Sequence, residues 1–357
     1  MKALCKRVRK PPSPPTGLSG RLPFESFECV SIGTYPTPVQ RVEALSTPGC
    51  DFWVKRDDQT NRELGGNKVR KLEHLLADAL EHGAKRLVTV GAAGSHHVLS
   101  TAYYGRRVGL EVEAVLVPQP MTDHVLDVLR AGIAQGLRVF PASTWAKAST
   151  IVVRRIAAGS RFLSIGGSSV TGSMGYVLAA RELALQVRAG LLPEPDVCVV
   201  ALGSGGTAAG LAAGFEVEGM KTRVAAMCVS EPPWAIPIIA RMLARACVRR
   251  AGATAGVEGG LAERLSVNSR FLGGGYGHPT PEGARATAIA WRAAELSLDP
   301  TYTAKAFAGA LSLSRARRDG NVLYWHTLSS APMDPLLRAA PLPDELDPAV
   351  RALLIPC

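Results

Sequence analysis

The sequence predicts an α/β protein in which a mostly parallel sheet is covered by helices on both faces. Short apolar runs typical of buried strands alternate with longer stretches in which apolar residues recur at helical spacing. Glycine-rich turns stand between several of these strand runs and the helical run that follows, as expected for repeated strand–helix units. The chain has 357 residues, 47% of them hydrophobic, which suits two domains or one large one.

Three segments can be recognised in the first 58 residues. Residues 1–20 are basic and rich in proline, and we expect a disordered tail there; they hold no apolar stretch of the kind found in a secretory signal. An organellar transit peptide or a misassigned start are the alternatives for this stretch. Residues 35–39 form an extended segment bounded by prolines. Residues 52–58 predict a short strand that ends in a charged loop.

The stretch Gly65-Gly66-Asn67-Lys68 opens the first clear helix. Leucines and alanines at helical spacing follow it, so Lys68 lies at or near a helix start. The helix dipole disfavours a cation at that end, and a lysine whose pKa is lowered is what Schiff-base chemistry needs. On this local pattern alone, a surface lysine on a basic helix is the alternative.

Strands and helices then alternate to residue 327. The expected strands cover 86–90, 112–117, 138–140, 161–165, 197–201, 223–229 and 321–327. The expected helices cover 71–82, a stretch ending at 104, and then 122–135, 145–158, 175–189, 234–250, 281–296 and 304–318. A glycine loop at 166–176 is expected to open the helix 175–189, and residues 251–270 are too polar to assign.

A second motif follows the apolar strand 197–201. Gly203, Ser204, Gly205, Gly206 and Thr207 form a loop that runs into a helix of small residues. Backbone N–H groups and a helix N-terminus in such a loop favour an anion, so we predict a phosphate site. The loop is neither a P-loop nor a full dinucleotide fingerprint. A lysine amine and a separate phosphate site on an α/β chain together suggest pyridoxal 5'-phosphate.

Composition limits the other classes of function. The net charge is +11, but it is spread along the chain without interleaved aromatic residues, so we expect no nucleic-acid partner. No apolar run reaches the length of a membrane span. The seven cysteines are scattered without C-x-x-C spacing, which favours a reducing compartment and a cytoplasmic location.

Taken together, these motifs resemble the 1-aminocyclopropane-1-carboxylate deaminase / D-cysteine desulfhydrase family of pyridoxal-phosphate enzymes, within the tryptophan-synthase-β-like group called fold type II. The resemblance runs from about Pro36 to Thr327. It rests on the segments 55–58, 65–73, 166–168, 203–207, 302–306 and 326–327.

The resemblance implies two domains, each with a mostly parallel sheet flanked by helices, and a cofactor in the cleft between them. Residues 21–71 and 180–345 would form the large cofactor-binding domain, with residues 72–179 inserted as a small domain. Residues 346–357 would be a C-terminal tail. The resemblance also implies a homodimer.

Residue roles follow from the resemblance. Lys68 would be the Schiff-base lysine and the base at Cα, the loop 203–207 would hold the phosphate, and Asn67 would lie beside the cofactor. Ser95 would contact the substrate carboxylate or relay a proton, with a helix N-cap as the alternative. The catalytic and substrate-binding set also takes in Tyr276 and Tyr302, and Thr327 would meet the pyridine nitrogen. Thr303 is the second candidate for that position.

The chain departs from the family in three places. His96-His97 follows Ser95 where the family has Asn and then His or Gln, and we expect both histidines to bind the substrate and His96 to lie beside the cofactor. Beside an anion the pKa of His96 should rise and make activity pH-dependent. Leu328-Ser329-Ser330 replaces the usual glycines, and Thr303 stands where ring-opening deaminases have Glu. We expect no metal site, because adjacent histidines diverge on a helix and no third ligand is suitably spaced.

The leading interpretation is a lyase that removes a β-substituent, such as a thiol, from a small amino acid to give a keto acid and ammonia. A relative with another leaving group, with β-replacement or with cyclopropane opening is the alternative among enzymes. A cofactor-binding protein with little turnover is the alternative of another class.

Overall fold

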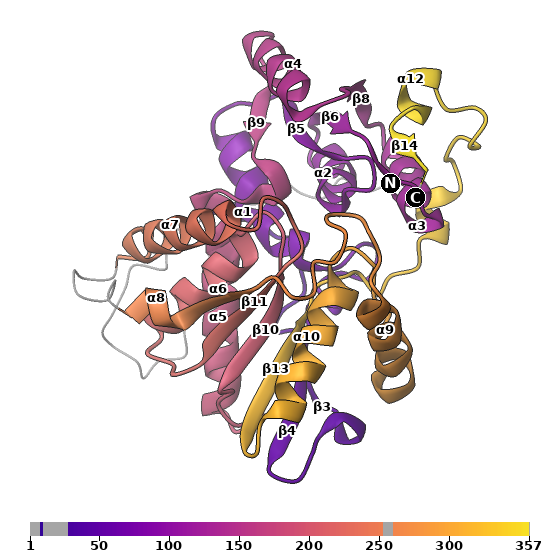
Figure 1. Ribbon diagram of the computed structural model, residues 1–357. Coiled ribbons are helices and arrows are strands. Elements are labelled where there is room, and N and C mark those ends of the chain that lie inside the picture. The colour runs from indigo at the N-terminus through magenta and orange to yellow at the C-terminus, as the bar shows by residue number, and fades with distance from the viewer. Residues whose placement is uncertain (1–7, 10–27, 253–259, 357) are drawn as a thin grey trace.

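The computed structural model describes residues 8–9, 28–252 and 260–356, and it confirms the predicted α/β class (Figure 1). Its strands form two larger sheets, one of six strands and one of four, and two strand pairs. Helices pack against both faces of each larger sheet. Every neighbouring pair in the larger sheets is parallel except one.

The six-stranded sheet has the order β12-β11-β10-β13-β4-β3. Its strands are β3 (Val39–Arg41), β4 (Cys50–Arg56), β10 (Val197–Leu202), β11 (Arg223–Cys228), β12 (Leu265–Asn268) and β13 (Gly320–His326). The antiparallel pair is β3 with β4. One face packs against α5 (Val170–Arg188), α6 (Gly206–Val217), α7 (Ala235–Arg250) and α8 (Leu261–Arg264), and the other against α9 (Pro281–Ala294) and α10 (Thr303–Ala316). Figure 1 shows α6 and α10 on opposite sides of β10 and β13.

The four-stranded sheet has the order β8-β6-β5-β9 and is parallel throughout. Its strands are β5 (Arg86–Ala92), β6 (Glu111–Val117), β8 (Arg138–Pro141) and β9 (Arg161–Leu163). Alternate residues of β5 and β6 point to opposite faces, as the period of a strand requires. One face packs on α1 (Asn67–Glu81), α2 (His96–Arg107) and α3 (Asp123–Ala134), and the other on α4 (Trp145–Ala157).

Short elements complete the chain. β7 (Gln119–Pro120) pairs with β14 (Leu354–Ile355), and β1 (Val8–Arg9) pairs with β2 (Cys29–Val30). The other short elements are the 3₁₀ turns η2 (Glu43–Leu45), η3 (Asp57–Gln59) and η4 (Ile165–Gly167), and the helices α11 (Asp334–Leu337) and α12 (Pro348–Arg351).

Both predicted tails need correction where the structure describes them. Residues 346–357 were expected to be a tail, but Val350 and Leu353 are buried in the core shared with α3, and β14 adds a strand to β7. At the other end, β1 pairs with β2, while the rest of the predicted tail 1–20 lies outside the described residues. The division into a large domain and an inserted domain stays a prediction.

The helix expected at 175–189 begins earlier, at Val170. The Ser169 hydroxyl accepts a hydrogen bond from the N–H of Gly172 at 3.2 Å and caps the helix there. Gly172 and Gly175 are therefore helical, and their role is close packing. A Cβ built on Gly175 would lie 2.1 Å from the carbonyl oxygen of Arg70, so α5 can approach α1 closely only because a side chain is missing. The strand β12 was also missed, since its polar neighbours obscured the pattern.

The Asp57 carboxylate ties α1 to the six-stranded sheet and to α5. It accepts hydrogen bonds from Arg70 at 2.8 and 2.9 Å, from Tyr176 at 2.8 Å and from the Trp325 indole at 2.7 Å. Thr37 adds another at 2.9 Å. Burial alone would raise the pKa of Asp57, but the charge and hydrogen bonds of Arg70 hold it below its usual value. Asp57 is thus a buried anion whose partners come from four separate segments of the chain.

The described residues contain no helix long and apolar enough to cross a membrane. Five cysteines lie in the described residues, and none of them forms a disulfide: Cys29, Cys50, Cys198, Cys228 and Cys247.

Candidate active site

Lys68 lies in the first turn of α1, as predicted. Gly66 caps the helix with φ of +90°, and its missing Cβ would lie 2.7 Å from the carbonyl oxygen of Thr327. The turn can therefore contact the end of β13 only if position 66 is glycine. The Lys68 amine donates to the Asn67 side chain at 3.1 Å. Burial lowers the pKa of Lys68 to about 8, against the opposing charge of Asp299.

The predicted phosphate loop joins β10 to α6. Gly205 has φ of +95° and begins the helix, and Gly206 is the first helical residue. The first N–H groups of a helix have no partner within it and attract anions. Asn67 reaches this point from α1, because its side-chain amide donates to the Thr207 hydroxyl at 3.1 Å. The structure thus brings Lys68 and the loop 203–207 together.

Lys71 and Ser168 stand at the same loop, and sequence reasoning missed both. The Lys71 amine donates to the carbonyl of Gly166 at 3.0 Å and to the Ser168 hydroxyl at 3.3 Å. That hydroxyl also meets the Ser204 hydroxyl at 2.7 Å and accepts from the Gly206 N–H at 3.0 Å. The spacing Lys68–Lys71 is one helical turn, so both amines share a face of α1, which is a signal that the sequence did contain.

The surroundings of Lys71 fit a bound anion. Its side chain is buried, and burial, reinforced by the charge of Lys68, lowers its pKa well below the usual value. Within the described residues its hydrogen-bond partners are neutral oxygens, although it points at the positive end of α6. A Cβ on Gly206 would lie 2.7 Å from its nitrogen. A buried amine facing a helix N-terminus is stabilised when an anion lies between them.

Ser95 has the alternative role that the sequence left open. Its hydroxyl accepts from the N–H of Val98 at 3.4 Å, so it is the N-cap of α2. It is only 9% exposed, at the carboxyl end of β5. A role toward the substrate carboxylate stays a prediction.

His96 meets another histidine, and our expectation for its pKa is wrong. Its Nε2 lies 2.7 Å from Nε2 of His124, and the rings stack with centroids 4.8 Å apart. Burial and the imidazole of His124 lower the pKa of His96 to about 3, and Lys68 acts in the same direction against Asp299. We had assumed an anionic neighbour, whereas the described neighbour is a base. His96 is therefore neutral at physiological pH.

His97 does not serve as a substrate ligand in this structure. Its side chain is 2% exposed, and its Nε2 lies 3.1 Å from the Thr89 hydroxyl of β5. Burial lowers the pKa of His97 well below its usual value, with Lys68 and Lys71 acting in the same direction. The ring fills space between β5 and η4, where a Cβ on Gly167 would lie 3.4 Å from it. We therefore correct its expected role from binding to packing.

Tyr276 and Tyr302 are brought together as expected. Their hydroxyls share a hydrogen bond of 2.6 Å, and the rings meet edge to face. Tyr302 also lies against the phosphate loop, because a Cβ on Gly203 would be 3.0 Å from its ring. Burial raises the pKa of Tyr276 to about 12 and that of Tyr302 well above its usual value. Both hydroxyls therefore keep their protons at neutral pH.

Asp299 organises the start of α10 beside these tyrosines. Its buried carboxylate accepts from the backbone N–H groups of Thr301, Tyr302 and Thr303 at 2.7 to 3.0 Å. The Thr303 hydroxyl donates to it at 2.6 Å. That hydroxyl is engaged at the helix cap, so Thr303 is not a suitable second candidate for the pyridine nitrogen. Asp299 was missed because a carboxylate before a helix is usually only a cap.

Thr327 lies at the end of β13, against the turn that precedes Lys68. Its carbonyl accepts from the N–H of Asn67 at 3.0 Å. The neighbouring Ser329 hydroxyl accepts from the N–H of Gly65 at 2.8 Å, so the residues that replace the family glycines support this turn. Contact between the Thr327 hydroxyl and a pyridine nitrogen stays a prediction. Among the described residues, no group of three or more His, Cys, Asp or Glu side chains could hold a metal ion.

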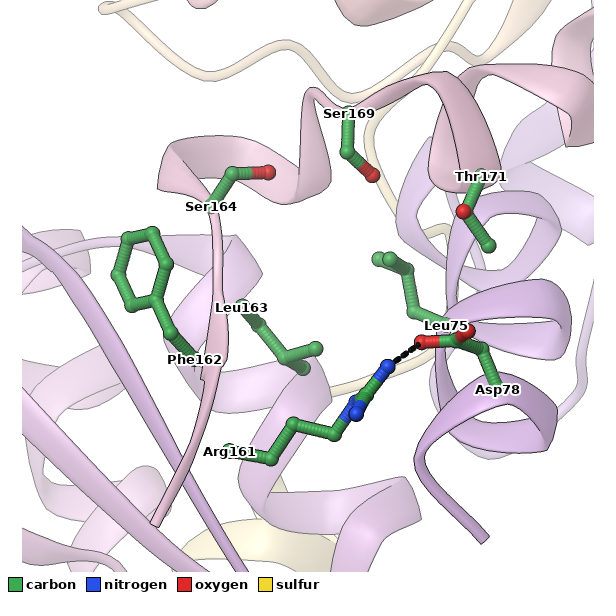
Figure 2. A pocket seen from close by; sticks show the side chains of 8 residues that line it. All are labelled: Leu75, Asp78, Arg161, Phe162, Leu163, Ser164, Ser169 and Thr171. Atoms are coloured by element: carbon green, nitrogen blue, oxygen red, sulfur yellow. Dashed lines mark hydrogen bonds and ion pairs between the residues drawn. The ribbon is translucent and has the colours of Figure 1, made fainter. Parts of the chain in front are cut away.

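A separate hollow of about 450 Å³ lies between α1, β9 and the start of α5 (Figure 2). Its eight lining residues are Leu75, Asp78, Arg161, Phe162, Leu163, Ser164, Ser169 and Thr171. Figure 2 shows the ion pair of Arg161 with Asp78, at 2.7 Å, on its wall. None of the candidate site residues lines it, so it is a different feature from the Lys68 site.

Comparisons with known proteins identify the family of this chain. The family model described as "Pyridoxal-phosphate dependent enzyme" matches residues 30–327. The D-cysteine desulfhydrase of Salmonella paratyphi A is 36% identical over 314 residues, which cover 82% of this chain and 91% of that protein. The D-cysteine desulfhydrase of Klebsiella pneumoniae is 33% identical over 310 residues, with the same coverage.

Solved structures share the fold of this chain. A homologue of ACC deaminase superimposes with a TM-score of 0.74 and 30% identity, covering 88% of this chain and 97% of that one. A threonine deaminase from Solanum lycopersicum has a TM-score of 0.60 and 15% identity, covering 85% of this chain and 82% of that one, which shows a shared fold.

Proposed function

Because this chain belongs to the pyridoxal-phosphate-dependent enzymes, we propose that it is a lyase that eliminates a β-substituent from a small amino acid, as its D-cysteine desulfhydrase relatives do. With D-cysteine and water, the products would be pyruvate, ammonia and hydrogen sulfide. One observation supports this most strongly. Two lysines stand one turn apart on α1: the buried Lys71 faces the α6 N-terminus, and the half-buried Lys68 has a pKa of about 8.

The residues present fit pyridoxal 5'-phosphate. Lys71, Ser204, Thr207 and the first N–H groups of α6 would hold its phosphate, at the place where a buried amine faces a helix N-terminus. Asn67, His96 and Thr327 would border the ring. Lys68 would provide the covalent attachment. Bound there, the cofactor supplies an electron sink for the negative charge left at Cα.

Lys68 has the properties needed for two tasks. An amine with a pKa of about 8 is partly unprotonated at neutral pH, so it is both a nucleophile toward a carbonyl and a base. With its amine unprotonated, Lys68 would take the proton from Cα. Ser95 would bind the substrate carboxylate and so fix which bond at Cα is broken.

The tyrosine pair would act on the leaving group. Both hydroxyls are protonated at neutral pH and joined at 2.6 Å, so one can donate a proton while the other stabilises the resulting charge. A departing thiolate receives that proton and leaves as hydrogen sulfide. Ring-opening deaminases have Glu where this chain has Thr303, whose hydroxyl is bonded to Asp299. Position 303 therefore offers no free carboxylate, which favours elimination over cyclopropane opening.

Two measurements test the proposal. Borohydride reduction of the holoenzyme followed by peptide mapping should label the peptide that contains Lys68; label elsewhere contradicts the assignment. The purified enzyme should then release hydrogen sulfide and pyruvate in equal amounts from D-cysteine or a similar amino acid. Retention of the amino group in a new amino acid would indicate β-replacement instead. Label on Lys68 without turnover of any amino acid in a broad panel would favour a cofactor-binding protein.

We also propose a cytoplasmic homodimer. The buried free thiols suit a reducing compartment. Trp234, Ile238, Ile239 and Met242 are 50% to 73% exposed on one side of α7, which supports a second copy as their partner. Light scattering should give twice the chain mass, and Met242→Glu should lower it; a monomeric wild-type protein contradicts this part.

A further inference from the structure

His124 is close to the site but has no role in the reaction described above. It is the second residue of α3, and His96 is the first residue of α2. These helices follow the neighbouring parallel strands β5 and β6, so both side chains start from the carboxyl edge of the four-stranded sheet. Both residues are half-buried. The charged groups that act on His96 are Lys68 of α1 and Asp299 before α10.

The contact between the two rings restricts where their protons can be. Nitrogens 2.7 Å apart form a hydrogen bond only if one carries a proton and the other has a lone pair. Two charged rings in this arrangement would repel each other, and the helix N-termini add to that repulsion. The pair therefore has two neutral forms, which differ in the ring that donates.

The two forms present different groups to a ligand. The structure leaves Nδ1 of His96 without a hydrogen bond in the described residues and does not bury it. If His96 donates through Nε2, its Nδ1 has a lone pair, which repels an anion. If His124 donates, Nδ1 of His96 carries a proton and can bind an anion as a neutral donor.

We propose that His124 is a positioning residue: its Nε2–H donates to Nε2 of His96, and this holds His96 as a neutral ring whose Nδ1–H binds the substrate carboxylate. The choice between the two forms rests on the proposed function, because an amino-acid substrate brings the anion. His96 then binds the carboxylate as an uncharged amide donor would.

The first test measures the tautomers directly. Holoenzyme labelled with ¹⁵N-histidine and saturated with D-alanine, which supplies the carboxylate and has no β-leaving group, is examined by correlating ring nitrogens with ring protons, and His96→Asn and His124→Gln assign the signals. We expect the proton on Nδ1 in His96 and on Nε2 in His124. A proton on Nε2 of His96 overturns the proposal. This result does not depend on turnover, so it separates failure of the proposal from failure of the proposed function.

The second test uses matched variants and D-cysteine. His124→Gln keeps a side-chain N–H donor, whereas His124→Phe keeps a ring and removes the donor. We expect His124→Phe to raise KM roughly two- to tenfold, as for one neutral hydrogen bond, with little change in kcat. His124→Gln should restore most of this loss. In a His96→Asn background, His124→Phe should have no further effect. Equal effects of Phe and Gln, or an unchanged effect in the His96→Asn background, overturn the proposal.

Discussion

Replacing Lys71 with methionine should have opposite effects on the free protein and on cofactor binding. The amine is buried, and burial lowers its pKa well below the usual value, so the charged form of Lys71 destabilises the folded apoprotein. Methionine has a similar length and needs no hydration. The variant loses two hydrogen bonds, of 3.0 and 3.3 Å, each contributing about 1 kcal/mol. Burying a charged amine costs several kcal/mol, and the variant avoids this cost. The gain should outweigh the two lost hydrogen bonds, so the free energy of unfolding should rise by roughly 1 kcal/mol.

The gain in stability should depend on pH in a defined direction. The unfolded chain holds the lysine proton up to a pKa of about 10.4, whereas the folded chain releases it earlier. The wild-type apoprotein therefore becomes more stable as pH rises toward that value. The advantage of Lys71→Met should be largest near pH 7 and should fade toward pH 10.

Cofactor affinity should fall in the same variant. One charge-assisted hydrogen bond to phosphate contributes about 1.5–3 kcal/mol, which corresponds to a Kd weaker by roughly 10- to 150-fold. Urea unfolding of the apoprotein and absorbance titration with pyridoxal 5'-phosphate measure the two quantities separately. Lys85→Met, at an exposed position after α1, is the control and should change neither. A less stable apoprotein with unchanged Kd would refute this reasoning.

Three further predictions concern the same region. Thr207→Val removes a hydroxyl at the start of α6 and should weaken cofactor binding roughly 10-fold or more while the loaded enzyme keeps most of its kcat; equal affinity in a titration contradicts it. Asp299→Asn removes the charge that raises the pKa of Lys68, so the pH midpoint for cofactor attachment to the apoprotein should move below about 8; an upward shift would count against this. Gly175→Ala places a Cβ 2.1 Å from the carbonyl oxygen of Arg70 and should lower the free energy of unfolding by about 1–3 kcal/mol, whereas Gly274→Ala, where a Cβ would lie in ordinary contact 3.5 Å from His278, should leave it nearly unchanged.

Local patterns in the sequence were sufficient for the fold class and for most elements. Helical periodicity after Lys68 and the glycine loop before α6 are local features, and the structure has both helices, although α1 begins at Asn67 and α6 at Gly206, each earlier than expected. Helix α5 was placed too late because its glycines look like a loop until α1 is packed against them. Strand β14 was missed because two residues form a strand only once β7 offers them hydrogen bonds.

The site was predictable to the extent that its residues lie in recognisable motifs. Lys68, the loop 203–207 and the two tyrosines belong to such motifs, and the structure brings them together. Ser168 belongs to the segment 166–168 but was given no role, and His124 comes from a segment with no motif, so only the folded chain shows their contacts. The direction of the pKa shift at His96 depended on one such neighbour. Electrostatic predictions fail where the nearest partner is distant in sequence.

The Asp57 carboxylate has a consequence for attempts to change the substrate by directed evolution. Its partners on α1, α5 and β13 are buried donors, and removing any one leaves an anion with an unmet hydrogen bond. Libraries that randomise Arg70, Tyr176 or Trp325 should therefore return mostly unfolded variants. Positions 96 and 124 lie outside this network, whereas Ser329 supports the turn before Lys68. Substitutions at positions 96 and 124 should change the shape of the pocket without disturbing the contacts that hold Lys68 in place.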